Sequence, residues 1–224
     1  MDSLCNACLS GLGGVRGGGV TVMAPHTRQV RYASDPISAR VEQLQFLLGE
    51  GPCRDAYTRS DPVLAEDLQA PVWQEQWPAF APAAVLAGAQ AVFALPLRVG
   101  TARVGVLDLY RDTAGGLAEQ TLADALVLAD AVTELLLAET LAGGDGDPVL
   151  AEGPGGYLLQ RAAVHQATGM TSVQLAVPVE DALARLRAYT FATGRELDEV
   201  AADVVARRLR FNELDDDDRA GEFR

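Results

Sequence analysis

Three cysteines and two histidines are the residues of this chain whose types and spacing could do thiol or metal chemistry. Cys5 and Cys8 form a Cys-x-x-Cys pair, a spacing that is used by zinc sites and by redox dithiols. A structural zinc site needs two further ligands, for which Cys53 and His26 are the candidates. The alternative, which we favour, is that Cys5 and Cys8 act as small apolar residues on a short N-terminal helix.

The segment LGEGPCRDAY, residues 48–57, places Cys53 at the start of a predicted short helix, after a loop of glycines and a proline. The N-terminus of a helix favours thiolate over thiol, so Cys53 is a candidate reactive or ligand-binding group. Trp77, in the segment PVWQEQWPAF, is a candidate for lining a ligand pocket. For both residues the alternative is packing in the core, the more common role of cysteine and tryptophan.

Sequence motifs typical of a catalytic site are absent from the chain. It has no G-x-S-x-G, H-E-x-x-H or Walker A motif. The glycine-rich run GGVRGGG, residues 13–19, lacks the lysine that would reach a phosphate, and its place before a strand predicts a flexible turn. We therefore expect a protein that is not an enzyme and that has no cofactor or metal.

Composition and charge limit the possible partners. Hydrophobic residues make up 49% of the chain, but no apolar run approaches the roughly 20 residues that span a bilayer. The N-terminus does not resemble a signal peptide, so we expect a cytoplasmic protein with free thiols and no membrane contact. The net charge of −13 opposes a general attraction to nucleic acid. Residues 155–211 differ, because seven arginines there face six acids.

The first part of the chain alternates between strand and helix patterns. Apolar alternation predicts strands at 19–24 and 28–34, and helical spacing predicts a helix at 37–49 that ends at Gly49. Two β-leaning runs, GAQAVFALPLRVG and ARVGVLDLYR, are joined by a short turn and predict a hairpin. A long amphipathic helix follows at 117–142. This order indicates an α+β fold with an antiparallel sheet.

The second part of the chain is predicted to be helical. Residues 143–156 are rich in glycine and proline and predict a linker. Three helices follow, at about 155–175, at about 179–193 and after a cap at Asp198. Their apolar positions predict a small bundle. The inner face of the first helix is expected to carry Leu159, Ala163, Met170 and Val173. Residues 212–224 contain four consecutive aspartates and predict a disordered acidic tail.

Taken in order, these segments resemble two known families. The first part looks like a GAF sensory domain of the actinobacterial type, on the segments ISARVEQLQFLLGEGPCRDAY, DPVLAEDL, WPAF, GAQAVFALPLRVG and RVGVLDLYRD. Residues 157–211 look like an ANTAR domain, the RNA-binding output module of transcription antiterminators. The matching residues there are Arg161, Ala167, Gly169, Met170, Ala182, Leu186, Arg187, Leu197, Val200 and Ala201.

The resemblance implies a GAF domain at 1–142 with a PAS-like sheet flanked by helices, and an ANTAR three-helix bundle at 157–211. It implies binding to hairpins in a leader RNA, which prevents transcription termination, together with an unidentified small ligand at the GAF domain. It also implies a homodimer, for which Leu126, Val132, Leu135, Leu136 and Leu137 of the long helix offer an apolar strip.

The RNA contacts that we expect come from basic and aromatic residues of the three helices, because splayed RNA bases stack on aromatic rings and guanidinium planes. They are Arg161, His165, Arg187, Tyr189, Arg207, Arg208 and Arg210. Arg161, His165 and Thr168 are predicted to form an exposed stripe, while small Ala163, Ala167 and Gly169 let the helices approach closely. Thr168 replaces the lysine of many ANTAR domains.

Two alternatives remain open. The arginines can form a solvated helix face with ion pairs such as Asp203–Arg207, and the chain can be a small-molecule or redox sensor whose bundle binds a protein. A further hypothesis is that the aspartates at 215–218 fold over the C-terminal arginines and compete with RNA, so that truncation after Leu214 raises RNA affinity.

Overall fold

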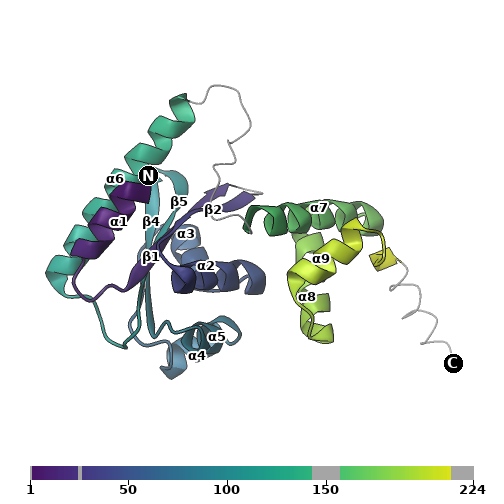
Figure 1. Ribbon diagram of the computed structural model, residues 1–224, viewed down its shortest axis with the longest axis horizontal. Helices are drawn as coiled ribbons and strands as arrows, with labels where there is room; N and C mark the ends of the chain where they lie inside the picture. The colour runs from purple at the N-terminus through teal and green to yellow at the C-terminus, as the bar shows by residue number, and fades with distance from the viewer. Residues whose placement is uncertain (1, 25–26, 143–156, 213–224) are drawn as a thin grey trace. The chain divides into compact units, whose positions relative to one another are not determined.

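The computed structural model describes residues 2–24, 27–142 and 157–212 (Figure 1). It divides into two compact units, residues 1–149 and 150–224. The predicted linker at 143–156, His26 and the aspartates at 215–218 lie outside the described residues. No helix among the described residues is both long enough and apolar enough to span a membrane.

The first unit is built on a five-stranded antiparallel sheet. Its strands are β1 (Gly17–Ala24), β2 (Thr27–Ala33), β3 (Val63–Ala65), β4 (Ala91–Val99) and β5 (Ala102–Arg111), in the order β2-β1-β5-β4-β3. The expected antiparallel sheet and the β4–β5 hairpin are confirmed. Strand β3 was not predicted, because it is too short for apolar alternation to be visible.

Helices cover both faces of the sheet. Figure 1 shows α1 (Asp2–Gly11) and α6 (Glu119–Ala142) on one face. The other face carries α2 (Pro36–Leu48), α3 (Pro52–Arg59), α4 (Pro71–Gln76) and α5 (Phe80–Leu86). Each face has its own apolar core, so the unit has three layers.

Alternation along β5 decides which side chains enter which core. Leu107 and Leu109 pack in the core beneath α1 and α6, whereas Val106 and Tyr110 pack in the core beneath α2 to α5. Successive side chains of a strand point to opposite faces. Asp108 therefore faces α2 and α3, where it is 3% exposed.

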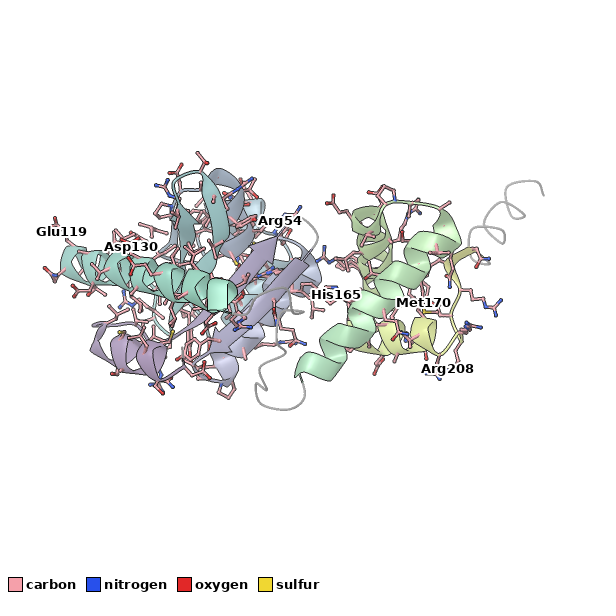
Figure 2. All side chains as sticks on the ribbon, turned by 90° about the horizontal axis from the view of Figure 1, so that it is seen from above. Arg54, Glu119, Asp130, His165, Met170 and Arg208 are labelled. Atoms are coloured by element: carbon pink, nitrogen blue, oxygen red, sulfur yellow. The ribbon has the colours of Figure 1, made fainter. Side chains whose placement is uncertain are left out.

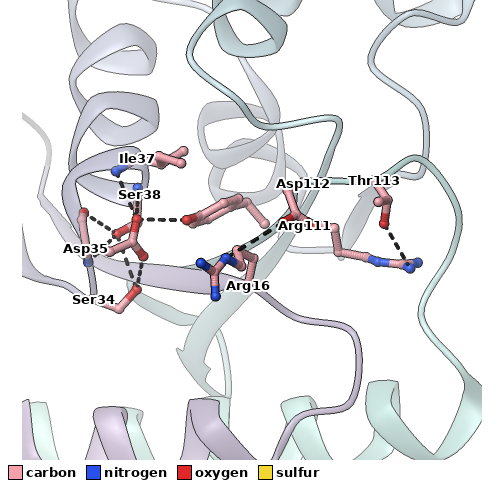
Figure 3. Close-up of polar contacts among 9 residues, drawn as sticks. Arg16, Ser34, Asp35, Ile37, Ser38, Arg111, Asp112 and Thr113 are labelled. Atoms are coloured by element: carbon pink, nitrogen blue, oxygen red, sulfur yellow. Dashed lines mark hydrogen bonds and ion pairs between the residues drawn. The ribbon is translucent and has the colours of Figure 1, made fainter.

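Asp35 fixes the beginning of α2 against the sheet. Its carboxylate accepts hydrogen bonds from the backbone N–H groups of Ile37 and Ser38, and the Ser38 side chain completes a capping box (Figure 3). The Tyr110 hydroxyl of β5 donates to the same carboxylate at 2.7 Å. At the other end Gly49 adopts the left-handed C-cap that the sequence predicted.

Two sequence-based expectations for the first unit are wrong in part. Gly17 and Gly18 belong to β1 rather than to a flexible turn, and Gly19 belongs to it as predicted. On α6, two of the five residues expected in the dimer strip, Val132 and Leu136, are buried in the core against the sheet, whereas Leu126 is exposed and Leu135 and Leu137 are half-buried. The spacing of Val132 and Leu136 is equally suited to packing against a partner helix or against the sheet, and here they pack against the sheet.

The second unit is a bundle of α7 (Tyr157–Leu175), α8 (Val179–Thr193) and α9 (Leu197–Val205), as expected. Its buried residues are Val164, Ala167, Thr168, Thr171, Ala182, Leu186, Leu197, Val200, Ala201, Val204 and Phe211. Asp198 was expected to cap α9, but the N-cap residue is Glu196 and no side chain caps it. Val173 was expected in the core but is 83% exposed.

Candidate functional site

A cluster of buried polar side chains lies between the sheet and helices α2 and α3. We call Glu42, Cys53 and Asp108 the acid–thiol cluster, because one carboxylate oxygen or sulfur atom from each lies within 4.8 Å of the others. The three residues are 1%, 0% and 3% exposed. Charged residues are rarely buried to this extent unless they are paired or bind a ligand.

Strand pairing and a missing side chain bring the two acids together. Asp108 of β5 is the direct partner of Gly19 in β1, and the Glu42 side chain of α2 crosses over this pair. A Cβ atom at position 19 would lie 3.0 Å from both Cγ and Oε1 of Glu42. Gly19 therefore provides the space that Glu42 occupies, which is a structural reason for part of the glycine-rich run.

Gln45, one turn after Glu42 on α2, links Asp108 of the sheet to Cys53 of α3. Its Nε2 donates to Asp108 Oδ2 at 3.2 Å, and its Oε1 accepts the backbone N–H of Cys53 at 2.7 Å. Gly51 precedes Cys53 with φ of 129°, and a Cβ there would lie 2.8 Å from Gln45 Oε1. The glycine before α3 is thus required both by its backbone angle and by the approach of Gln45.

Only one of the two carboxylate oxygens of Glu42, and only one of Asp108, accepts a hydrogen bond. Glu42 Oε2 accepts from the Thr21 hydroxyl at 2.6 Å and lies 3.5 Å from Nη2 of Arg28. Asp108 Oδ2 accepts from Gln45. The other two oxygens, Glu42 Oε1 and Asp108 Oδ1, are buried and have no hydrogen-bond partner within the described parts of the chain. Such atoms are costly to bury and need an explanation.

Burial controls the protonation of the cluster. Burial and the nearby Glu42 raise the pKa of Asp108 well above that of an exposed aspartate. Burial and the neighbouring Asp108 raise the pKa of the Cys53 thiol well above its ordinary value. Full burial of Cys53 agrees with the packing alternative, because desolvation opposes the thiolate more than the helix N-terminus favours it.

A small cavity of about 10 Å³ adjoins the two acids and is lined by Gly19, Glu42, Asp108 and Tyr110, among others. Sites for drug-sized organic ligands enclose about 300–1,000 Å³. This cavity is about the size that one water molecule needs. It therefore suits an ion or a water molecule rather than a nucleotide or a pigment.

The other candidate residues of the first unit lie elsewhere. Trp77 is 2% exposed, stacks on Trp73 with ring centroids 4.8 Å apart, and belongs to the core beneath α2 to α5. Cys5 is buried on α1, which raises the pKa of its thiol to about 11, and Cys8 is half-buried on the same helix. These positions agree with the packing alternative for Trp77 and Cys5.

The predicted RNA contacts of the second unit are found in different environments. His165 is exposed on α7, and Arg208 is exposed just beyond α9 (Figure 2). Arg208 and Arg195 both pair with Asp203, in place of the expected Asp203–Arg207 pair. Arg207, with φ of 59°, is exposed where α9 ends.

Arg187 and Tyr189 on α8 are half-buried. The Tyr189 ring makes an edge contact with Phe211, with centroids 5.4 Å apart, so it helps to hold Phe211 on the bundle. Arg161 belongs to α7, but its side chain is outside the described part.

The predicted exposed stripe on α7 is wrong at Thr168. This residue is 4% exposed and its hydroxyl donates to the Val164 carbonyl at 2.7 Å. The interpretation of Gly169 is also wrong, because it is exposed and a Cβ there would meet nothing within 4 Å. Ala167, in contrast, is fully buried as expected. Thr168 therefore takes the core position that was expected for Gly169.

Three residues with unusual environments were not predicted from the sequence. Glu42 and Asp108 were overlooked because each is a single acid within an apolar helix or strand. Their position on the core-facing side was the available signal, since a lone buried acid is unusual. Phe191, 84% exposed on α8, was also missed. Its surroundings depend on the bundle, so the sequence contained no clear signal for it.

Comparison with known proteins addresses the first unit. Residues 1–137 match the family model described as GAF domain. The GAF domain region of a membrane protein from Geobacter sulfurreducens is similar at 19% identity, with 62% of this chain and 91% of that chain covered and a TM-score of 0.51.

The GAF domain of a two-component sensor histidine kinase from Bacillus halodurans matches at 14% identity, with 63% and 96% covered and a TM-score of 0.47. No curated protein sequence matches. Because the family match spans more than half of the 224 residues, the chain belongs to the GAF domain family.

Proposed function

We propose that this protein is a signal-responsive regulator that binds hairpins in leader RNA and prevents transcription termination. In this proposal the GAF unit senses the signal and the three-helix unit contacts the RNA as part of a homodimer. The protein acts by binding and not by catalysis. Membership of the GAF family supports the sensing role, and the acid–thiol cluster offers a buried polar site for the signal.

The core of the second unit supports the likeness to an ANTAR domain. Most of the small and apolar residues that carry the likeness are fully or almost fully buried where the three helices meet. They are Ala167, Ala182, Leu186, Leu197, Val200 and Ala201. The residue pattern on which the resemblance rests is therefore one that this bundle needs in order to pack.

The exposed Phe191 is the observation that carries the RNA proposal. Its side chain is 84% exposed on α8, one helical turn after Arg187. An aromatic ring is costly to expose, and sequence-specific RNA recognition stacks unpaired bases on such rings. The guanidinium group of Arg187, one helical turn away, is suited to contact an RNA phosphate. Tyr189 is less suited to stacking, because its ring already packs against Phe211.

The test begins with the hairpin RNAs that the full-length protein enriches from total cellular RNA. Direct binding to an enriched hairpin is then compared for the wild type and Phe191→Ala. Base–aromatic stacking is worth about 1–3 kcal/mol, so the variant should bind about 5- to 150-fold more weakly. Read-through of a terminator placed after the hairpin should fall in parallel in a transcription assay.

Val173→Ala is the matched control, because Val173 is an equally exposed apolar residue, on α7. It should bind RNA like the wild type, and both variants should keep the helical circular dichroism of the wild type. If no RNA is enriched over an unrelated acidic protein, the RNA proposal fails. The alternative, a sensor whose bundle binds a protein partner, would then be favoured.

A further inference from the structure

The acid–thiol cluster has the donor atoms of a metal site. Glu42 and Asp108 come from α2 and β5 and offer carboxylate oxygens, while Cys53 comes from α3 and offers sulfur. We infer that these three residues bind one divalent transition-metal ion. The inference concerns the GAF unit alone and does not depend on RNA binding.

The unpartnered oxygens point to a ligand at this place. Glu42 Oε1 and Asp108 Oδ1 have no hydrogen-bond partner within the described residues, although both side chains are more than nine-tenths buried. A buried carboxylate oxygen without a partner is destabilising. Without metal, a proton shared between Asp108 and its neighbours Glu42 and Cys53 relieves this cost, and a cation between the three residues replaces that proton and accounts for both oxygens at once.

The distances are compatible with coordination. The three donor atoms lie within 4.8 Å of one another. Around a tetrahedral zinc ion, with Zn–O of about 2.0–2.2 Å and Zn–S of about 2.3 Å, donors are about 3.3–3.7 Å apart. Small side-chain rotations therefore bring the set to bonding geometry. The adjoining cavity of about 10 Å³ has room for a water molecule as the fourth ligand.

Charge balance favours a divalent ion. Two carboxylates and one thiolate carry three negative charges, and Arg28, 3.5 Å from Glu42, supplies one positive charge. A divalent cation neutralises the remaining two charges, which a buried site requires. The ion displaces the protons that a buried thiol and carboxyl hold without it.

The thiol selects the kind of metal. Magnesium and calcium prefer sites made of oxygen ligands only, whereas a thiolate favours zinc and related transition metals. The site also joins three separate elements, so a bound ion would tie α2 and α3 to the sheet. That connection gives a physical route from metal binding to the shape of the GAF unit.

The test is a titration of the metal-free full-length protein with Co²⁺, which reports a thiolate ligand through ligand-to-metal charge-transfer absorption. The wild type should show this absorption with one ion per chain, and Zn²⁺ should displace the cobalt while Mg²⁺ should not. In Cys53→Ser the absorption should disappear. Loss of a residue that only hydrogen-bonds to a metal ligand lowers metal affinity by about 10- to 100-fold. Because Asp108 is itself a proposed ligand, Asp108→Asn should lower cobalt affinity by more than this.

Cys8→Ser is the matched control and should bind cobalt like the wild type, because Cys8 lies on α1, outside the acid–thiol cluster. Native-like emission from Trp73 and Trp77 shows that each variant is folded, since both tryptophans are in the GAF unit. The inference is overturned if the folded wild type binds no cobalt, or if the charge-transfer absorption survives in Cys53→Ser. Neither result would bear on RNA binding, which is measured separately.

Discussion

Replacing Thr21 by valine tests whether the polar contacts around Glu42 stabilise the GAF unit. Thr21 is fully buried in β1, and its hydroxyl donates to Glu42 Oε2 at 2.6 Å. Valine has nearly the same shape and is a good strand residue, so Thr21→Val removes the hydrogen bond with little change in packing. The buried carboxylate then keeps Arg28 as its remaining partner among the described residues.

The expected cost follows from the charge of the acceptor. A hydrogen bond to a charged group contributes about 1.5–3 kcal/mol. With an m-value of about 2 kcal/mol/M, as is usual for a domain of this size in urea, the unfolding midpoint should fall by about 0.8–1.5 M. The m-value itself should stay unchanged, because the folded core remains compact.

Tryptophan fluorescence makes the assay specific to one unit. The chain has two tryptophans, and both lie in the unit of residues 1–149. Urea unfolding followed by tryptophan emission therefore reports the GAF unit even though the bundle is present. The protein is used at full length and free of metal, so that ligand binding does not contribute to the measured stability.

Thr133→Val provides the matched control. Thr133 is also buried, but its hydroxyl donates to the Ala129 carbonyl within α6, a neutral acceptor, at 2.8 Å. The carbonyl keeps its place in the helix, so the control should cost less than about 1 kcal/mol. If Thr21→Val costs no more than Thr133→Val, the Thr21–Glu42 contact does not stabilise the cluster and the reasoning fails.

Two further predictions concern titratable groups. In the native protein a thiol-specific disulfide reagent should label half-buried Cys8 first. Cys53 should react only on unfolding, because burial raises the pKa of its thiol well above the ordinary value. Labelling of Cys53 in the native protein, detected by peptide mass spectrometry, would contradict this. Asp35→Ala should cost about 0.5–2 kcal/mol at pH 7, measured by urea unfolding. Burial acts to raise the pKa of Asp35, but hydrogen bonds from Ser34, Tyr110 and the backbone outweigh it and lower the pKa below 3.8. The stabilisation is therefore complete above this unfolded value and is lost as the pH falls through the folded value, so the cost should shrink in acid and not in base.

Local signals in the sequence were sufficient for most elements. The end of α2 follows from Gly49, which acts within one helical turn, whereas its cap Asp35 was not predicted and the helix begins at Pro36 rather than at residue 37. The β4–β5 hairpin follows from two apolar runs and a short turn. The three helices of the second unit follow from their apolar spacing. Each of these depends on neighbours in the chain, which the sequence displays directly.

The sides that these elements bury were decided by tertiary structure. Val132 and Leu136 of α6 were equally suited to a partner helix or to the sheet, and the sheet covers them. Thr168 and Gly169 are adjacent, and only the packing of α7 in the bundle puts the threonine inside and the glycine outside. Helical periodicity identifies a face but not what covers it.

The acid–thiol cluster shows the same division most clearly. The sequence by itself determined an α+β unit followed by three helices, because turns and periodicity are local, while the likeness to a GAF domain rested on the resemblance of whole segments to that family. It also contained Glu42, Cys53 and Asp108, but on separate elements with no motif to connect them. Only the fold places the three together, because β5 pairs with β1 at Gly19 and α2 and α3 pack over that pair. The chemistry of a site assembled from distant segments depends on those distances, and only the tertiary structure provides them.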